Sequence, residues 1–162
     1  MKFYTVSNAY INFLKKIDHK VPNNYQRKKP FIGVVLEINA HKYLAPLTSY
    51  KPKQDNYEKS FPTLVKLYER ENPANKLGMI QLNNMIPVIE SEIQLLDIEN
   101  QPEPYRSLLY KQYEFIKIKV IEVEIKKKAK KLYDLVVNKK QEFYCGISCD
   151  FKSLEDNYRN FG

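Results

Sequence analysis

Two adjacent hydroxyls, a phenol and two lysines stand close together in one short segment of the chain. They are Thr48, Ser49, Tyr50, Lys51 and Lys53. Hydroxyl groups donate hydrogen bonds to phosphate oxygens and lysines neutralise phosphate charge, so this set suits an anionic, phosphate-like ligand. The segment follows an apolar run that predicts a strand, so we expect the set to lie in a loop at a strand end.

A second group of polar and basic residues lies upstream, before another predicted strand. It contains Tyr25, Arg27, Lys28 and Lys29. Together the two groups hold what RNA cleavage without a metal requires: a group to take the 2′-OH proton, charge stabilisation at phosphorus, and a proton for the 5′-oxygen. Lysine or tyrosine beside other cations can serve where histidine is missing. The alternative for both groups is a solvated loop, since lysines and hydroxyls are common in loops.

Other arrangements that would predict a reaction or a metal site are missing from the sequence. It contains no Gly-x-Gly-x-x-Gly and no P-loop, and neither His19 nor His41 lies in a recognisable motif. Cys145 and Cys149 do not make a four-ligand zinc site with these distant histidines, and we expect semi-buried free thiols. The sequence therefore predicts no metal and no cofactor.

Length, composition and charge limit the classes of protein to consider. The chain has 162 residues, 43% of them hydrophobic, so we expect one folded domain over residues 1–162. A formal charge of +8 favours RNA, DNA or an anionic membrane surface as partner, with an ordinary basic protein as the alternative. Thirteen tyrosines favour nucleic acid, because tyrosine stacks on bases. Since no apolar signal segment or membrane-spanning run is present, we expect a cytoplasmic protein.

The N-terminal part of the chain predicts a strand, a helix and a hairpin. The expected elements are a strand Phe3–Val6, a helix Asn8–Ile17 capped by Ser7, and hairpin strands Phe31–Asn39 and Lys42–Leu47 joined at Asn39 and Ala40. The first hairpin strand is almost continuously apolar, which is typical of a strand buried on both sides. Gly33 within it predicts a bend or bulge.

The rest of the chain predicts more short strands and then helices. The expected strands are Val65–Tyr68, Leu77–Leu82 and Met85–Val88, with a turn region over Glu69–Lys76, and a last strand near Tyr144–Ile147. Apolar residues at spacings of three or four predict one long helix over Tyr105–Asn138, although residues 116–125 also alternate with period two. A short helix is expected over Phe151–Tyr158. This pattern predicts an α+β fold with a small barrel-like sheet.

Several blocks of the sequence resemble the type III toxin–antitoxin endoribonucleases, the family of ToxN, AbiQ and CptN. The segment Tyr43–Lys53 is similar to the family core Y-x-A-P-L-[ST]-S-x-K-x-K, and Gly78–Val88 to G-x-I-x-L-N-N-M-I-P-V. Lys20–Pro22 and Lys29–Glu37 resemble its K-V-P and R-P-Y-I-G-I-V-L segments, and Lys2–Ser7 resembles its opening. The resemblance extends over nearly the full chain.

The resemblance implies a compact SH3-like core, an antiparallel β-barrel of the Kid/MazF type with added helices. It also implies metal-independent RNA cleavage by 2′-OH attack, which leaves a 2′,3′-cyclic phosphate and a 5′-hydroxyl. The family's active-site positions carry over onto Tyr25, Lys29, Thr48, Ser49 and Lys51. Lys29 and Lys51 are expected to manage charge and proton transfer, Thr48 and Ser49 to orient the phosphate, and Tyr25 to position the nucleotide.

The family's inhibitor is a small folded repeat RNA, often a pseudoknot, that joins the toxin in a cyclic assembly. We therefore expect an RNA antitoxin as partner, with Lys53, Lys2, Arg27 and Lys28 as further RNA contacts and the run Lys126–Lys131 as a weaker candidate. Phage defence by abortive infection is the implied role. Two alternatives remain open: a non-catalytic SH3-like nucleic-acid-binding module, and a MazF-like toxin inhibited by a protein.

Overall fold

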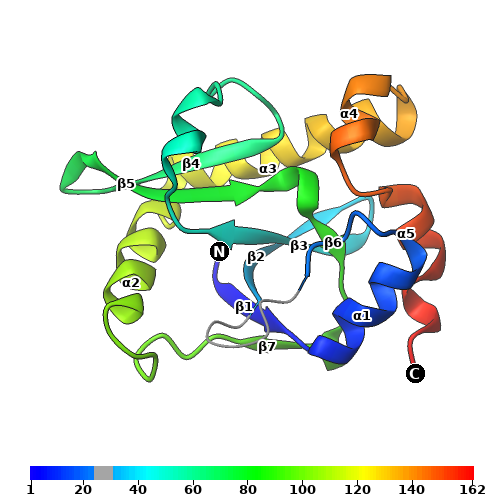
Figure 1. The fold of residues 1–162 in the computed structure, drawn as a ribbon, viewed down its shortest axis with the longest axis horizontal. Coiled ribbons are helices and arrows are strands. Elements are labelled where there is room, and N and C mark those ends of the chain that lie inside the picture. Colours follow the sequence, from blue (N-terminus) through cyan, green and yellow to red (C-terminus); the bar gives the residue numbers. More distant parts are fainter. Residues whose placement is uncertain (24–30) are drawn as a thin grey trace.

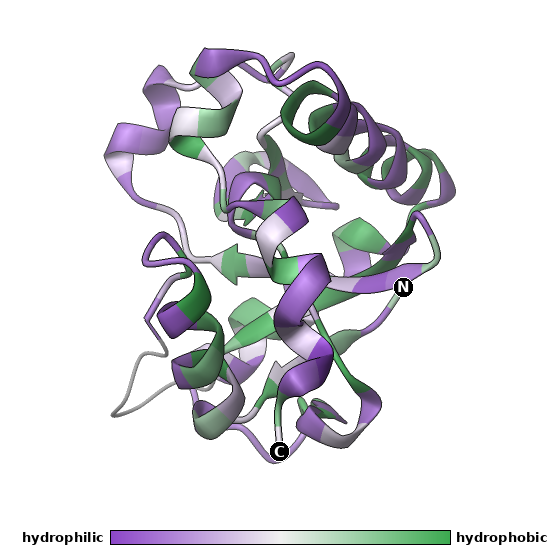
Figure 2. Ribbon diagram, turned by 90° about the vertical axis from the view of Figure 1, so that its right-hand side faces the viewer, coloured by the Kyte–Doolittle hydropathy of each residue, from purple (hydrophilic) through white to green (hydrophobic). Residues whose placement is uncertain are grey.

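The computed structural model describes residues 1–23 and 31–162, which form an α+β fold (Figure 1). The strands are β1 (Phe3–Val6), β2 (Ile32–Ile38), β3 (His41–Thr48), β4 (Leu64–Glu69), β5 (Asn72–Gln81), β6 (Ile86–Pro87) and β7 (Ile93–Leu95). The α-helices are α1 (Asn8–Ile17), α2 (Tyr105–Ile116), α3 (Lys119–Tyr133), α4 (Glu142–Ile147) and α5 (Phe151–Asn157). Hydrophobic residues concentrate on the inner strands, whereas the surrounding helices mix both kinds (Figure 2).

All strand pairs of the sheet are antiparallel, and β3 is its central strand. The hydrogen-bonded order is β4-β5-β3-β2-β1-β7, with β6 also paired to β3. Among the described residues the end strands β4 and β7 do not pair, so the sheet is open and not the barrel that the sequence predicted. Helix α2 contacts the terminal strand β4, so a helix covers the sheet end where a barrel would need another strand.

The predicted elements at the N-terminus are confirmed. The side chain of Ser7 accepts a hydrogen bond from the backbone N–H of Tyr10, which satisfies one of the free donors at the start of α1. Asn39 and Ala40 have φ values of 52° and 63°, as the tight turn between β2 and β3 requires. This hairpin fixes the direction in which β3 delivers its last residue, Thr48.

Gly33 does not form the predicted bulge. It pairs in regular register with Tyr4 on one side and Pro46 on the other. A Cβ atom at this position would lie 2.3 Å from the carbonyl oxygen of Ala45. The glycine is therefore needed because β3 approaches the β2 backbone closely.

Two predictions for the C-terminal half are wrong. The long helix is interrupted at Lys117, and Ile118 adopts an extended conformation (φ −62°, ψ 126°) before α3 begins. Helix α2 packs mainly against β4 and β5, whereas α3 packs against β2 and reaches β4 through Lys128, so the break lets the two helices take different positions on the sheet. The predicted strand near Tyr144–Ile147 is helix α4, whose backbone bonds are local, as in the bond from the Cys145 N–H to the Gln141 carbonyl (3.0 Å).

The predicted turn over Glu69–Lys76 is also too long. Strand β5 begins at Asn72, which pairs with Glu69, so the two strands form a ribbon closed by a tight turn. Residues 72–76 pair only with β4, because β3 reaches no further along β5 than Met79. This extension places Lys76 beside the loop that follows β3, at the position where the site is built.

Hydroxyl groups of buried tyrosines join elements that are distant in the sequence. The Tyr43 hydroxyl donates to a carboxylate oxygen of Glu155 in α5 (2.7 Å), and the Tyr10 hydroxyl donates to the Pro87 carbonyl (2.6 Å). Burial raises the pKa of both phenols, and Glu155 raises that of Tyr43 further. Burial and then Asp18 raise the pKa of the Cys149 thiol to about 12. These groups stay protonated in the folded protein.

We expect the protein to lose stability as the pH rises above about 9. The folded-state pKa of Tyr10, Tyr43 and Cys149 lies above the unfolded value, so the unfolded chain releases these protons first. The stabilisation is complete below the unfolded pKa values and declines above them. Thermal unfolding between pH 7 and 11 measures the slope, which should be smaller in Tyr43→Phe and unchanged in the control Tyr110→Phe, whose side chain is exposed. Equal slopes in all three proteins would contradict this account.

Candidate active site

Thr48 and Ser49 lie where β3 ends, pressed against the backbone of β5. Thr48 pairs with Met79, and a Cβ atom on the neighbouring Gly78 would lie 1.9 Å from the Thr48 carbonyl oxygen. Gly78 also has a backbone φ of +125°, which residues other than glycine rarely adopt. The sequence singled out Thr48 and Ser49, but only the structure shows that a glycine on another strand makes room for them.

A buried glutamine that the sequence did not single out holds these two residues. The Gln54 side chain is 3% exposed, and its amide nitrogen donates to the Thr48 hydroxyl (3.3 Å) and to the Ser49 carbonyl (3.0 Å). The Gln54 backbone N–H donates to the Lys51 carbonyl (2.9 Å), which begins the 3₁₀ turn η1 (Pro52–Asn56). One residue therefore fixes the chain from Thr48 to Lys51. Its role could not be predicted from the sequence, because glutamine is common in polar loops.

Gln54 also sets which way the Thr48 hydroxyl can donate. That hydroxyl accepts from Gln54 and donates its own hydrogen to the Ser49 carbonyl (3.0 Å). Since the Ser49 carbonyl already accepts from Gln54, the Thr48 hydrogen can turn to a ligand without leaving that carbonyl unsatisfied. The half-buried Ser49 hydroxyl has no hydrogen-bond partner among the described residues. Both hydroxyls are thus available to an anionic oxygen.

We expect Gln54→Leu to lower the free energy of unfolding by about 1–3 kcal/mol, because it removes both amide hydrogen bonds and leaves the Thr48 hydroxyl oxygen without its donor. Urea denaturation measures this difference. Gln94→Leu, on an exposed residue of β7, is the control and should change stability little. If Gln54→Leu were as stable as the unchanged protein, the amide would not hold the loop.

Lys51 and Lys53 supply positive charge at the rim of this loop. Both side chains are exposed, and neither has a carboxylate within ion-pair distance in residues 1–23 and 31–162. Lys111, in contrast, is paired with Glu69 (3.1 Å). The charges of Lys51 and Lys53 are therefore not neutralised by a described carboxylate, and their role in binding an anion remains a prediction.

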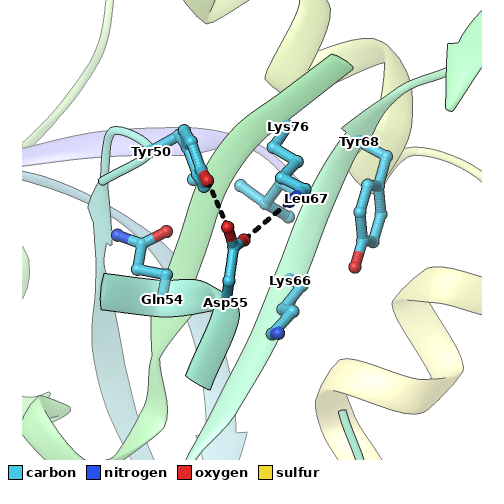
Figure 3. Close-up of a pocket in the computed structure, with 8 residues that line it drawn as sticks. Tyr50, Gln54, Asp55, Lys66, Leu67, Tyr68 and Lys76 are labelled. Atoms are coloured by element: carbon cyan, nitrogen blue, oxygen red, sulfur yellow. Dashed lines mark hydrogen bonds and ion pairs between the residues drawn. The ribbon is translucent and has the colours of Figure 1, made fainter. Parts of the chain in front are cut away.

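A three-residue network that the sequence did not predict stands beside the loop. Asp55 accepts hydrogen bonds from the Tyr50 hydroxyl (2.6 Å) and from Lys76 (2.8 Å), as the dashed lines in Figure 3 mark. The Lys76 hydrogen bond holds the pKa of Asp55 below its usual range, and the bond to Asp55 raises the pKa of Tyr50. Asp55 is therefore ionised and Tyr50 is neutral near pH 7. Lys76 lies 21 residues from Asp55, so only the β4–β5 ribbon brings them together.

The upstream half of the predicted site lies outside the described residues. This concerns Tyr25, Arg27, Lys28 and Lys29. The first described residue after them, Phe31, is buried, and its carbonyl accepts from the Val6 N–H (3.3 Å) at the beginning of β2. Because Gly33 pairs with Pro46, the strand register brings the start of β2 to the end of the sheet where Thr48 lies.

Lys2 is not brought near the loop. Phe3 pairs with Val34, so Lys2 lies at the opposite end of the strands, level with Leu44. Four strand positions separate Leu44 from Thr48, which corresponds to ~13 Å along the strand. A role for Lys2 in RNA binding remains a prediction, and it would require an RNA that extends well beyond the loop.

His41 and the two cysteines contact other parts of the fold. His41 contacts the Tyr158 hydroxyl (2.8 Å), and Cys145 and Cys149 are free thiols, as predicted. In residues 1–23 and 31–162 no three His, Cys, Asp or Glu side chains come together in a way that could hold a metal ion. No helix of the same residues has the length and apolar character to cross a membrane.

Strand β3 of the open antiparallel sheet ends in a loop of hydroxyls and lysines, residue types that suit an anionic ligand. Residues 2–159 match the family of the toxin ToxN of type III toxin–antitoxin systems, and the chain belongs to this family. It is 47% identical over 167 residues to the endoribonuclease ToxN of Pectobacterium atrosepticum, which covers 100% of this chain and 94% of that protein. The family resemblance drawn from the sequence is thereby confirmed.

Among the solved structures that share this fold are two from antiviral or anti-phage systems. One comes from a bacterial antiviral system regulated by a processed non-coding RNA. It has a TM-score of 0.89 and 44% identity, over 100% of this chain and 99% of that one. The other is AbiQ, a lactococcal anti-phage endoribonuclease of a type III toxin–antitoxin system. It has a TM-score of 0.85 and 34% identity, over 99% of this chain and 96% of that one.

Proposed function

We propose that this protein is an endoribonuclease toxin, with the loop from Thr48 to Lys53 as one half of its active site. The observation that carries the proposal is that two available hydroxyls and two unpaired lysines occupy the segment similar to the family core. Relatives named as endoribonucleases support it. The upstream group at Tyr25 and Lys29 supplies the other half, and the whole chain, residues 1–162, acts as one domain.

The proposed reaction is a transesterification within the RNA chain, and it needs no metal. The 2′-oxygen attacks phosphorus and forms a new P–O bond, while the bond from phosphorus to the 5′-oxygen breaks. The 2′-OH proton goes to a basic group, and a proton is delivered to the departing 5′-oxygen. Ser49 and Thr48 donate to the phosphate oxygens and Lys51 stabilises their charge. The products are a 2′,3′-cyclic phosphate and a 5′-hydroxyl.

Lys29 and Tyr25 take the remaining roles in this proposal. Lys29 shares charge and proton transfer with Lys51, and Tyr25 positions or stacks on the nucleotide. Phe31, the first described residue after this group, lies just before β2 at the sheet end that carries Thr48, which supports a site built from both segments.

The proposed partner is a folded small RNA that inhibits the toxin within a cyclic assembly. The relative regulated by a processed non-coding RNA supports this. The charge of +8 suits such a partner, and contacts from Lys53, Lys2, Arg27 and Lys28 would release counterions from its phosphates. We place the activity in the cytoplasm and propose phage defence by abortive infection as its role, which AbiQ, named as anti-phage, supports. The same proposal includes a distant structural relationship between the open sheet and the SH3-like Kid/MazF fold.

Incubating the purified protein with a mixed RNA substrate in the presence of EDTA tests the activity. We expect cleavage at a limited set of sites at the rate seen without EDTA, because the proposed groups supply all proton and charge transfer. Lys29→Ala should abolish cleavage while its circular dichroism spectrum and unfolding midpoint stay unchanged. Loss of activity in EDTA, restored by a divalent cation, would contradict the mechanism.

A further inference from the structure

A cleft of about 240 Å³ opens beside the proposed active-site loop, on the side of the β4–β5 ribbon (Figure 3). It is lined by Tyr50, Gln54, Asp55, Lys66, Leu67, Tyr68, Lys76 and Gly78. Gln54 and Gly78 are the residues that hold and accommodate Thr48, so the cleft adjoins the position proposed for the scissile phosphate. Whatever occupies the cleft is therefore a direct neighbour of the bond to be cut.

The cleft combines apolar and aromatic surface with a few polar groups. Leu67 and Gly78 lie buried in its wall, and the half-buried rings of Tyr50 and Tyr68 supply aromatic surface. A lysine lies over each ring, with Lys76 Nζ 5.4 Å from the Tyr50 ring centre and Lys59 Nζ 4.5 Å from the Tyr68 ring centre. A flat aromatic ligand gains from such a surface, whereas a bare phosphate would not.

Asp55 gives the cleft a hydrogen-bond preference. Its two oxygens each accept one bond, from Tyr50 and from Lys76, and an ionised carboxylate can accept about four. Lys76 and Lys66 keep the pKa of Asp55 below its usual range, so the carboxylate remains ionised and can only accept. Figure 3 shows Asp55 between Tyr50 and Lys76, with Tyr68 beyond them. The remaining lone pairs of the Asp55 carboxylate can accept hydrogen bonds from a ligand.

We propose that this cleft is a nucleobase subsite that reads the nucleotide next to the cut through Asp55. The inference rests on the proposed nuclease function and specifies how that same site selects its substrate. The chemistry favours a base whose edge presents an exocyclic amino group to the carboxylate. It disfavours uracil, whose only edge donor lies between two carbonyl oxygens. Lys66 and Lys76 neutralise the adjoining backbone phosphate.

Short RNA substrates that carry each of the four bases in turn at every position flanking the cut test this subsite. For the unchanged protein we expect one flanking position at which uracil lowers kcat/KM by about tenfold, equal to ~1.4 kcal/mol. In Asp55→Asn the new amide both donates and accepts, so this preference should fall to less than about twofold at that position and stay unchanged elsewhere. Tyr68→Leu should reduce kcat/KM for every base at that position by removing aromatic surface.

The control is Asp156→Asn, which removes a similarly exposed carboxylate paired with Lys152 on the remote helix α5. It should leave every preference unchanged. If Asp55→Asn kept the base preference, or lowered the rate equally for all substrates, the subsite assignment would fall while the nuclease function stood. No preference against uracil at any position in the unchanged protein would also overturn the subsite. No cleavage of any substrate by the unchanged protein would instead refute the proposed function.

Discussion

Replacing Ser49 by alanine is expected to lower kcat/KM for RNA cleavage by about 10²–10³-fold and to remove toxicity in growing cells. The half-buried hydroxyl has no partner among the described residues, so its hydrogen is free for the phosphate, and a single donor to a developing charge has an effect of that size. The loss should appear in kcat, because the charge on the phosphate oxygens grows only in the transition state. Single-turnover cleavage of a defined RNA measures it.

Ser60→Ala is the matched control for this substitution. Ser60 is exposed and lies in the turn before β4, so its replacement should leave both rate and growth unchanged. Ser49→Ala should unfold at the same urea concentration as the unchanged protein, because no intramolecular bond of the described structure is lost. Retained nuclease activity in both Ser49→Ala and Lys29→Ala would sink the site assignment.

Replacing Gly78 by alanine should have the largest effect on stability. The added Cβ atom would lie 1.9 Å from the Thr48 carbonyl oxygen, and the backbone there has φ +125°. Clash and strain together are expected to lower the free energy of unfolding by about 3 kcal/mol. Because the neighbour that must move is the backbone of Thr48, kcat/KM should also fall, by about 10²-fold for a shift of ~1 Å. Urea denaturation and cleavage assays measure the two effects separately.

Gly146→Ala provides the comparison for Gly78→Ala. Gly146 lies in α4, and a Cβ atom there would meet nothing within 4 Å. Alanine favours a helix over glycine by about 0.5–1 kcal/mol, so this variant should be equally or slightly more stable. If the two glycine substitutions had the same effect, close packing of β5 on the Thr48 carbonyl would not position the site.

Local sequence patterns predicted the N-terminal elements because their causes are local. Ser7 precedes an apolar helical pattern and caps α1, and Asn39 precedes a tight turn between two apolar runs. The loop of hydroxyls and lysines could likewise be found, because Thr48, Ser49 and Lys51 are adjacent in sequence. The order of these elements and the family resemblance were enough to locate half of the proposed site.

Tertiary contacts decided the features that the sequence did not show. The break at Ile118 separates two helices that pack on different strands, and nothing in the apolar spacing marks it. The sheet ends at β4, which α2 contacts, and this contact joins distant segments of the chain. Gln54 and the pair of Asp55 with Lys76 gain their roles only when the β4–β5 ribbon and the loop come together. Residue types alone did not distinguish them from other polar loop residues.

The account depends most on the claim that the protein cleaves RNA by attack of the 2′-OH at the Thr48–Ser49 loop. The most direct test is cleavage of a short RNA in which only the nucleotide on the 5′ side of the mapped cut is 2′-deoxy, in buffer that contains EDTA. We predict that this bond stays intact while the all-ribose RNA is cut to a 2′,3′-cyclic phosphate and a 5′-hydroxyl. Cleavage of the 2′-deoxy bond at the rate of the unmodified bond would contradict the account.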